Sequence, residues 1–480
     1  MDPCFATATQ IVRAIRSGKL SSLEATQLHL DRIARFNGPI NALVIIDSDG
    51  ALKAARAADR ARARKGAKLG PLHGVPITIK EAFDVAGLAT TASHPPLKDN
   101  VAAVDASSVA RLRAAGAVIL GKTNVPELCM DFQCNSPIYG ETKNPWDATR
   151  GPGGSTGGGG AAVAARFTPL ELGSDIGGSV RNPSHFNGVF GLKPTEWRVP
   201  ARGHVPDLPG QTRTVRFMGT FGPLARSVAD LELSLRLIAG PDGHEAEAAP
   251  VPIGPTPVFK PRDLRIAVLD SNALMPASAD TRAVVQTTAK LLAKAGMKVK
   301  AAQPEGLDWE RAWDDWSDLY QYENRALQPL TDRERFFANV DSPDPSRRSV
   351  ARAARLDLGA FFSLLARRDE DIRRCEALFD DYDAWLMPVV ATAAFKRQKS
   401  GAPIPVDGVD QHYFRVGTAY TFLGNFTGQP SIVLPCGFSR EGLPIGLQIT
   451  GKRWAEAKLL GVAKAIEKLL PPCPLPPAYA

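Results

Sequence analysis

The chain has 480 residues, 44% of them apolar and 22% charged, which excludes a disordered protein and allows a substantial core. The net charge is +8, but the arginines and lysines are spread out and no RNA- or DNA-binding motif accompanies them, so no nucleic-acid partner is expected. No signal peptide and no membrane span are predicted. The six cysteines and seven histidines show no CxxC, HxxxH or HxH spacing, so we expect reduced thiols, a cytoplasmic location and no metal site.

The first part of the chain predicts helices followed by strand–helix–strand units. Residues 1–64 are expected to be helical from their apolar spacing, with a helix start marked by the serines and glutamate at 21–24. The run at 74–80 (GVPITIK) is rich in β-branched residues and predicts a buried strand that ends at Lys80. A helix and another buried strand are expected within 109–120.

Two glycine-rich segments follow. The first, at 151–160 (GPGGSTGGGG), precedes a small-residue run at 161–165 that predicts a close-packed helix. The second, at 174–181 (SDIGGSVR), follows a strand predicted at 169–173. Further on, a stretch rich in Pro and Gly at 240–261 is the best candidate for the boundary of an inserted subdomain or a peripheral layer.

The later elements return to core character. We expect strands at 264–269, 385–388, 431–435 and 445–449, and helices at 281–295, 309–322 and 455–469. Such an order favours the α/β class, with a large mixed, mostly parallel twisted sheet covered by helices on both faces. We expect a single domain, 1–480, that comprises an N-terminal helical region (1–64), a core (65–240), a variable region (262–425) and a return to the core sheet (426–470).

The glycines do not form a known nucleotide loop. A phosphate loop needs GxxxxGK[ST], which is absent here. A dinucleotide loop needs GxGxxG with an acidic residue about 20 positions later, and Asp175 lies near that distance from Gly154 but in a different turn. Nucleotide binding is therefore disfavoured, and no cofactor is predicted.

The turn at 175–179 (DIGGS) has two interpretations. Consecutive backbone N–H groups could converge beside the Ser179 hydroxyl, which is the arrangement of an oxyanion hole. Alternatively, this is a glycine turn with a serine that makes a local hydrogen bond. The turn alone leaves both open.

A serine nucleophile needs a base, and no GxSxG or other histidine-hydrolase signature is present. Lys80, at the end of a buried strand, is the most suitable lysine, because burial disfavours its charged form. The alternative is a surface lysine that caps the strand, and the adjacent Glu81 keeps that alternative open.

The segment 153–184 resembles the amidase signature at close to full length. Other stretches also resemble the family and stand in its usual order: GVPITIKEAFDVAG, GKTNVPEL and NPWD before the signature, and GVFGLKPT, GPLARS, GQPSIVLP and GLPIGLQI after it. The resemblance covers roughly residues 5–470, which is far more specific than one glycine-rich loop.

This resemblance implies a Ser–cis-Ser–Lys triad, with Ser179 as nucleophile, Ser155 as proton relay and Lys80 as base. The Gly154–Ser155 peptide bond would be cis. The two serines are 24 residues apart and Lys80 precedes Ser155 by 75, a spacing similar to that of the fatty acid amide hydrolase branch. The implied oxyanion hole consists of the backbone N–H groups of Ile176, Gly177, Gly178 and Ser179, and the implied supporting residues are Thr156, Asp175, Arg181 and Cys129.

The function that this implies is hydrolysis of a carbon–nitrogen amide bond, and of an aryl ester, anilide or carbamate, in a small apolar substrate. The alternative is the glutaminase subunit of a tRNA-dependent amidotransferase. A third class, a binding protein that keeps the fold without catalysis, is disfavoured because Lys80, Ser155 and Ser179 are all present. Aromatic residues at 217, 309–322 and 361–362 suggest an apolar pocket, and a monomer or homodimer is expected.

Overall fold

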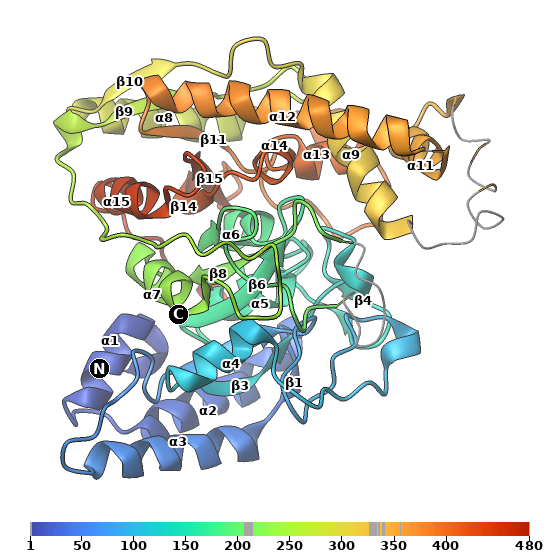
Figure 1. Cartoon of the computed structure of the whole chain (residues 1–480). Coiled ribbons are helices and arrows are strands. Elements are labelled where there is room, and N and C mark those ends of the chain that lie inside the picture. Colours follow the sequence, from blue (N-terminus) through green and yellow to red (C-terminus); the bar gives the residue numbers. More distant parts are fainter. Residues whose placement is uncertain are drawn as a thin grey trace.

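An eleven-stranded β-sheet runs through the molecule in this computed structural model (Figure 1). Its strand order is β1-β3-β2-β6-β8-β7-β14-β15-β11-β9-β10. The strands are β1 (Leu43–Ile46), β2 (Pro76–Lys80), β3 (Val118–Thr123), β6 (Leu170–Asp175), β7 (Phe190–Lys193), β8 (Thr220–Ala225), β9 (Arg265–Val268), β10 (Lys298–Ala301), β11 (Ala384–Pro388), β14 (Ser431–Phe438) and β15 (Pro444–Thr450). The structure describes residues 2–205, 215–325, 334, 337, 341–355 and 357–479.

The sheet is mixed, as predicted. Parallel pairing joins β3, β2 and β6 towards one edge and β11, β9 and β10 at the other. The strands between them pair antiparallel, as β1 does with β3. The antiparallel share is larger than expected, because β14 and β15 form a hairpin and β7 lies antiparallel to β8.

Helices cover both faces, which confirms the predicted fold class. On one face, α1, α4, α7, α8 and α15 contribute to a cluster over strand residues such as Ile79 and Ile119. On the other, α2, α3 and α5 pack against Val118 and Leu120, while α9 and α12–α14 pack over Trp385. The helices are α1 (Ala8–Arg16), α2 (Ser22–Ile40), α3 (Ser48–Ala63), α4 (Ser107–Ala114), α5 (Gly157–Ala164), α6 (Arg181–Asn187), α7 (Val228–Ile238), α8 (Ala279–Lys294), α9 (Trp309–Arg325), α11 (Pro345–Arg355), α12 (Leu358–Asp381), α13 (Tyr413–Thr418), α14 (Phe422–Phe426) and α15 (Glu456–Glu467).

Several local predictions hold, and three need correction. The helix start near Ser21 is confirmed, since its side chain and that of Glu24 form a capping box. The N-terminal region is not entirely helical, because 43–46 forms the edge strand β1. The glycines at 157–160 lie inside helix α5 and not in a loop before it. For the chain after 261, the alternative of an inserted subdomain does not hold, because β9, β10 and β11 extend the main sheet at one edge, as a peripheral layer would.

The topology brings the chemically important segments to one end of the parallel strands, where their carboxyl termini lie. Strands β2 and β6 are parallel neighbours, so their carboxyl-terminal residues, Lys80 and Asp175, lie side by side at the same end of the strands. The turn that follows β6 leads into α6, and the segment before α5 carries Ser155. In open α/β sheets, ligands usually bind just beyond the carboxyl ends of the strands.

Candidate active site

Lys80 is the last residue of β2, and its side chain is completely buried. Its Nζ lies 2.7 Å from Ser155 Oγ and 2.8 Å from Ser174 Oγ. Burial lowers the pKa of Lys80, and nearby Cys129 and Asp175 offset only part of that effect. The surroundings therefore favour the neutral amine, which is the form a base requires.

Ser155 stands just before α5, and the peptide bond that joins it to Gly154 is cis. It is 1% exposed. The next residue, Thr156, donates its backbone N–H to the carbonyl of Ser179 over 3.1 Å. This bond ties the two serine-bearing segments together, while the supporting role of Thr156 stays a prediction.

The turn after β6 wraps around the side chain of Asp175. That carboxylate accepts hydrogen bonds from the backbone N–H groups of Gly178 (2.8 Å) and Val180 (3.1 Å). Gly178 adopts a φ of +121°, which favours glycine. The N–H of Gly178 is therefore engaged, and the structure removes it from the predicted oxyanion hole.

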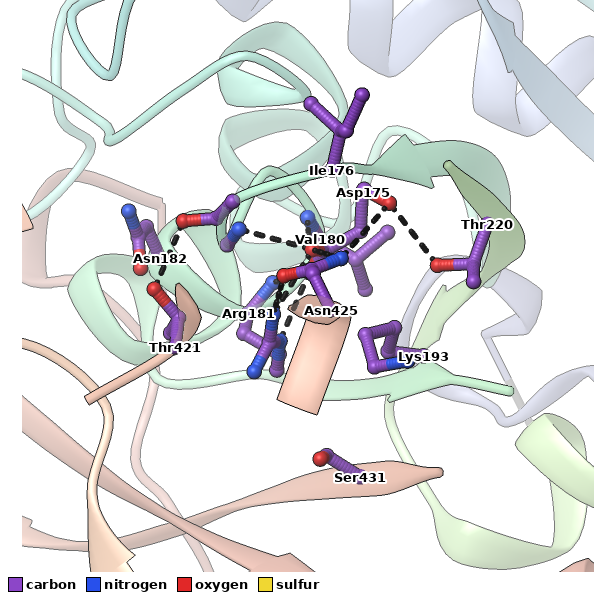
Figure 2. A network of polar contacts seen from close by, with 12 residues as sticks. Asp175, Ile176, Val180, Arg181, Asn182, Lys193, Thr220, Thr421, Asn425 and Ser431 are labelled. Carbon is purple, nitrogen blue, oxygen red and sulfur yellow. Dashed lines mark hydrogen bonds and ion pairs between the residues drawn. The ribbon is translucent and has the colours of Figure 1, made fainter. Parts of the chain in front are cut away.

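Asp175 is in turn fixed by a buried ion pair with Arg181 (Figure 2). Arg181 Nη2 lies 2.9 Å from Asp175 Oδ1, and Nε lies 3.0 Å from Oδ2. The Asn425 side chain donates to Asp175 Oδ1 over 3.0 Å and also contacts Arg181. Burial alone would raise the pKa of Asp175, but Arg181 holds that pKa well below its usual range. Asp175 and Arg181 thus fix the turn that carries Ser179.

Two side chains hold the carbonyl groups of this turn. Trp316 Nε1 donates to the carbonyl of Ile176 over 3.2 Å, and Thr421 Oγ1 donates to that of Gly177 over 2.7 Å. Because C=O and N–H point in opposite directions across a trans peptide, each carbonyl contact also orients the next N–H group. Within the described chain, the N–H groups of Ile176, Gly177 and Ser179 have no backbone partner, so they remain candidates for binding an oxyanion.

Ser155 and Ser179 line the same cavity, beside Cys129. Its other polar lining includes Ser174, His204 and Asn324, and its apolar lining includes Leu128, Ile176, Val205, Val215, Phe221 and Tyr320. Asp175 is the only acidic residue among the described lining residues, and none of them is Lys or Arg. The cavity thus combines a cluster of hydroxyl groups with a largely apolar wall.

Of the aromatic residues expected at a pocket, Tyr320 on α9 lines this cavity. Its ring stacks on Trp316 with centroids 6.0 Å apart. Trp309 and Trp313 are core residues, while Phe362 is exposed. The aromatic segment therefore supplies one wall of the cavity and otherwise packs the core.

The sequence did not single out Ser174 and His204. Ser174 precedes Asp175 directly, and its hydroxyl contacts both Lys80 Nζ and His204 Nε2, the latter at 2.9 Å. Its position inside the signature segment 153–184 could have drawn attention to Ser174. His204 has no local motif and reaches the site through tertiary contacts. His73 and His185, which lie close to the motifs in the sequence, contact backbone carbonyls elsewhere.

Comparison with known proteins identifies the family. The amidase family model matches residues 24–460, most of the chain. The chain belongs to the amidase family. It is 36% identical to an indoleacetamide hydrolase from Bradyrhizobium diazoefficiens, over 96% of this chain and 86% of the relative. It is also 34% identical to a component of the glutamyl-tRNA(Gln) amidotransferase of Moorella thermoacetica, over 98% and 97% of the two chains.

A solved structure of another amidase, 6-aminohexanoate cyclic dimer hydrolase with its substrate, superposes with a TM-score of 0.81. The two chains share 29% identity, and the match covers 98% of each. This protein is therefore an enzyme that hydrolyses carbon–nitrogen amide bonds, and its substrates are small amide molecules. No helix in the described part of this amidase is long and apolar enough to cross a membrane.

Proposed function

We propose that this amidase cleaves an apolar amide through an acyl-enzyme on Ser179, with Ser155 as proton relay and Lys80 as base. The observation that carries the proposal is the 2.7 Å contact between the buried Lys80 amine and Ser155 Oγ, in a site where Ser155 and Ser179 line one cavity. A serine hydroxyl becomes a good nucleophile only when a base takes its proton, and a desolvated lysine can supply that base.

The proposed reaction moves one proton along this chain of groups. Neutral Lys80 takes the proton of Ser155, which takes that of Ser179 as Ser179 Oγ bonds to the substrate carbonyl carbon. When the C–N bond breaks, Ser155 gives its proton to the leaving nitrogen and recovers one from Lys80. Water then repeats the sequence at the acyl-enzyme and releases the acid. Each step conserves protons and needs no cofactor.

The negative charge that develops on the carbonyl oxygen needs donors that are already oriented. The N–H groups of Ile176, Gly177 and Ser179 are the proposed donors, and the contact of Trp316 with the carbonyl of Ile176 supports the orientation of the Gly177 N–H. One such donor typically contributes about 3 kcal/mol to transition-state stabilisation.

The cavity favours an uncharged, partly aromatic substrate. Its wall is largely apolar and includes Phe221 and Tyr320. Such surfaces bind apolar rings, while a few polar groups orient the reacting bond. A relative 36% identical to this chain is an indoleacetamide hydrolase, so we infer that an aryl or heteroaryl acetamide is a fitting substrate class. Aryl esters, anilides and carbamates would enter by the same acylation step.

The glutaminase alternative keeps one supporting observation, the identity to components of glutamyl-tRNA(Gln) amidotransferases. Glutamine carries an α-ammonium and an α-carboxylate, and each needs an opposite charge or several hydrogen bonds. The described lining offers one carboxylate, Asp175, which is bound to Arg181, and no lysine or arginine. An apolar amide therefore fits the described cavity better than glutamine.

A hydrolysis panel tests both candidates. It would contain indole-3-acetamide, other primary amides, anilides, p-nitrophenyl esters, carbamates and L-glutamine. We expect turnover of aryl amides, and a loss of about 10⁴-fold or more in kcat/KM for Ser179→Ala. Labelling by a fluorophosphonate should likewise be lost in Ser179→Ala. A variant that keeps its labelling and activity would show that Ser179 is not the nucleophile, and exclusive glutaminase activity would favour the alternative.

Two further predictions concern the cellular context. The cytoplasmic location and the monomeric or homodimeric state stay predictions. Cell fractionation and light scattering of the purified chain would test them, and a larger complex with other proteins would favour the amidotransferase alternative.

A further inference from the structure

His204 is held beside Lys80 by the segment that follows β2. The backbone N–H of Asp84 donates to the carbonyl of Gly203 over 2.7 Å, and that of Val205 donates to Ala82 over 2.9 Å. These two bonds attach the residues on either side of His204 to the chain just after Lys80.

The imidazole ring also packs against two aromatic side chains. Its centroid lies 4.6 Å from that of Phe83 and 5.0 Å from that of Phe221, with interplanar angles of 74° and 54°. The backbone and ring contacts together fix the ring, and its Nε2 faces Ser174.

A continuous chain of short polar contacts then runs from this ring to the proposed relay serine. His204 Nε2 is 2.9 Å from Ser174 Oγ, Ser174 Oγ is 2.8 Å from Lys80 Nζ, and Lys80 Nζ is 2.7 Å from Ser155 Oγ. Three consecutive contacts of this length leave few arrangements for the hydrogens.

A neutral amine can accept only one hydrogen bond, so which group donates and which accepts at each contact matters for catalysis. Neutral Lys80 has one lone pair and two N–H bonds. For the lone pair to accept the proton of Ser155, an N–H must face Ser174, whose oxygen accepts it. The hydroxyl hydrogen of Ser174 then needs an acceptor of its own, and His204 Nε2 lies within reach.

We propose that His204 is a positioning residue, which accepts the Ser174 hydroxyl and thereby aims the lone pair of Lys80 at Ser155. This inference rests on the proposed function of Lys80 and Ser155. It requires a neutral imidazole with its hydrogen on Nδ1. With a hydrogen on Nε2, the ring would donate to Ser174, and the Ser174 hydroxyl would turn towards Lys80 and occupy the lone pair that Ser155 needs.

The titratable groups around the ring agree with a neutral imidazole. The charged group that acts on the ring is Lys80 on β2, while Cys129 in the 3-10 helix η3 (Glu127–Cys129) and Asp175 at the end of β6 line the same cavity. Asp175 is neutralised by its ion pair with Arg181. Burial, together with the positive charge of protonated Lys80, keeps the pKa of His204 well below its usual range.

A double-mutant cycle tests the inference. His204→Phe keeps an aromatic ring and removes the acceptor, so we expect kcat to fall about 10- to 100-fold, with KM changed less than about 3-fold. His204→Gln, which can place an amide oxygen near the position of Nε2, should recover most of the loss. In a Ser174→Ala background, His204→Phe should lower kcat by less than about 2-fold, because His204 acts by accepting the Ser174 hydroxyl, which is then absent.

His73→Phe is the matched control, because it removes a histidine that contacts the carbonyl of Ala58, outside the cavity. Rates are expressed per site titrated with a fluorophosphonate, so that misfolded protein does not count. If no amide in the panel is turned over, the rate of fluorophosphonate labelling at Ser179 replaces kcat in the same cycle.

The inference is overturned if His204→Phe stays within about 2-fold of the wild type, if its loss is equal in the two backgrounds, or if His204→Gln gives no recovery. Failure of the proposed function looks different: Ser179→Ala would then keep its labelling and activity whatever residue stands at position 204.

Discussion

Glycines are concentrated both at 157–160, in α5, and at 177–178, in the turn before Ser179, yet their surroundings differ. A methyl group on Gly158, Gly159 or Gly160 would come within 2.4–2.7 Å of Asn124, Glu171 or Asn187 in the buried core. A methyl group on Gly177 would instead meet the ring of Trp316, at 2.8 Å, beside the cavity. The first set lets segments pack closely, whereas the second lets backbone groups face a ligand.

This difference explains why a glycine-rich stretch can resemble a nucleotide loop and yet serve only packing. The glycines of α5 are buried, and the N–H groups of Gly158 and Gly160 bind the carbonyls of Asn124 and Thr156. Of the two segments, only the turn after β6 keeps backbone N–H groups beside the cavity. Substitution of single glycines in the two segments should therefore separate stability from catalysis.

The largest effect is expected in the turn. In Gly177→Ala the new methyl group collides with Trp316, whose ring is buried and stacked on Tyr320, so the turn must shift. We expect kcat to fall about 100-fold or more, the loss typical of one displaced oxyanion donor, with little change in the free energy of unfolding. Steady-state kinetics and urea unfolding of the same preparation would measure both. Unchanged kcat would mean that this turn does not bind the oxyanion.

The matching change in α5 should act on stability. In Gly159→Ala the methyl group would lie 2.6 Å from Glu171 Cγ, so we expect the free energy of unfolding to fall by about 2 kcal/mol, although alanine favours helices.

Gly359→Ala, near the start of α12, is the control for Gly159→Ala, because the nearest atom to its added methyl group is Asp357 Oδ1 at 3.4 Å, an ordinary contact. It should be neutral or stabilising by up to about 1 kcal/mol. Urea unfolding distinguishes the two variants, and a stable Gly159→Ala would show that the close approach to Glu171 is not limiting.

The contrast also shows what a sequence can reveal. The helix start at Ser21, the strand that ends at Lys80 and the fold class follow from local patterns, and the structure agrees with them. The roles of the α5 glycines do not follow from local patterns, because their close neighbours, Asn124 after β3 and Glu171 on β6, belong to other elements. The same holds for His204, and for Asn425, which contacts Asp175 from 250 residues away.

The triad was predictable in part from the sequence. The motifs around Lys80, Ser155 and Ser179 were evident in the sequence, whereas the engagement of the Gly178 N–H by Asp175 required three-dimensional positions. A motif specifies which residues stand together, but the partner of each N–H group depends on how the turn closes.

A smaller effect is expected from the residue that orients the turn. Trp316→Phe keeps an aromatic ring against Gly177 but loses the hydrogen bond to the carbonyl of Ile176. We expect kcat to fall about 5-fold, the effect of one neutral hydrogen bond of about 1 kcal/mol. Trp313→Phe loses a comparable bond to Thr418, away from the cavity lining, and serves as the control. Equal losses in the two variants would indicate a general packing defect.

The last prediction concerns Lys80 and the dependence of stability on pH. Burial lowers the native pKa of Lys80 below its ordinary value, so between these two pKa values the unfolded chain binds more protons than the native one. The free energy of unfolding of the wild type, relative to Lys80→Met, should therefore rise with pH up to the ordinary lysine pKa and then level off. The slope for one group is at most about 1.4 kcal/mol per pH unit. Urea unfolding between about pH 7 and pH 10, with exposed Lys98→Met as the control for lost charge, measures it. A difference that stays flat or falls with pH would mean that Lys80 is not held towards the neutral amine, and the proposed base would lose its physical support.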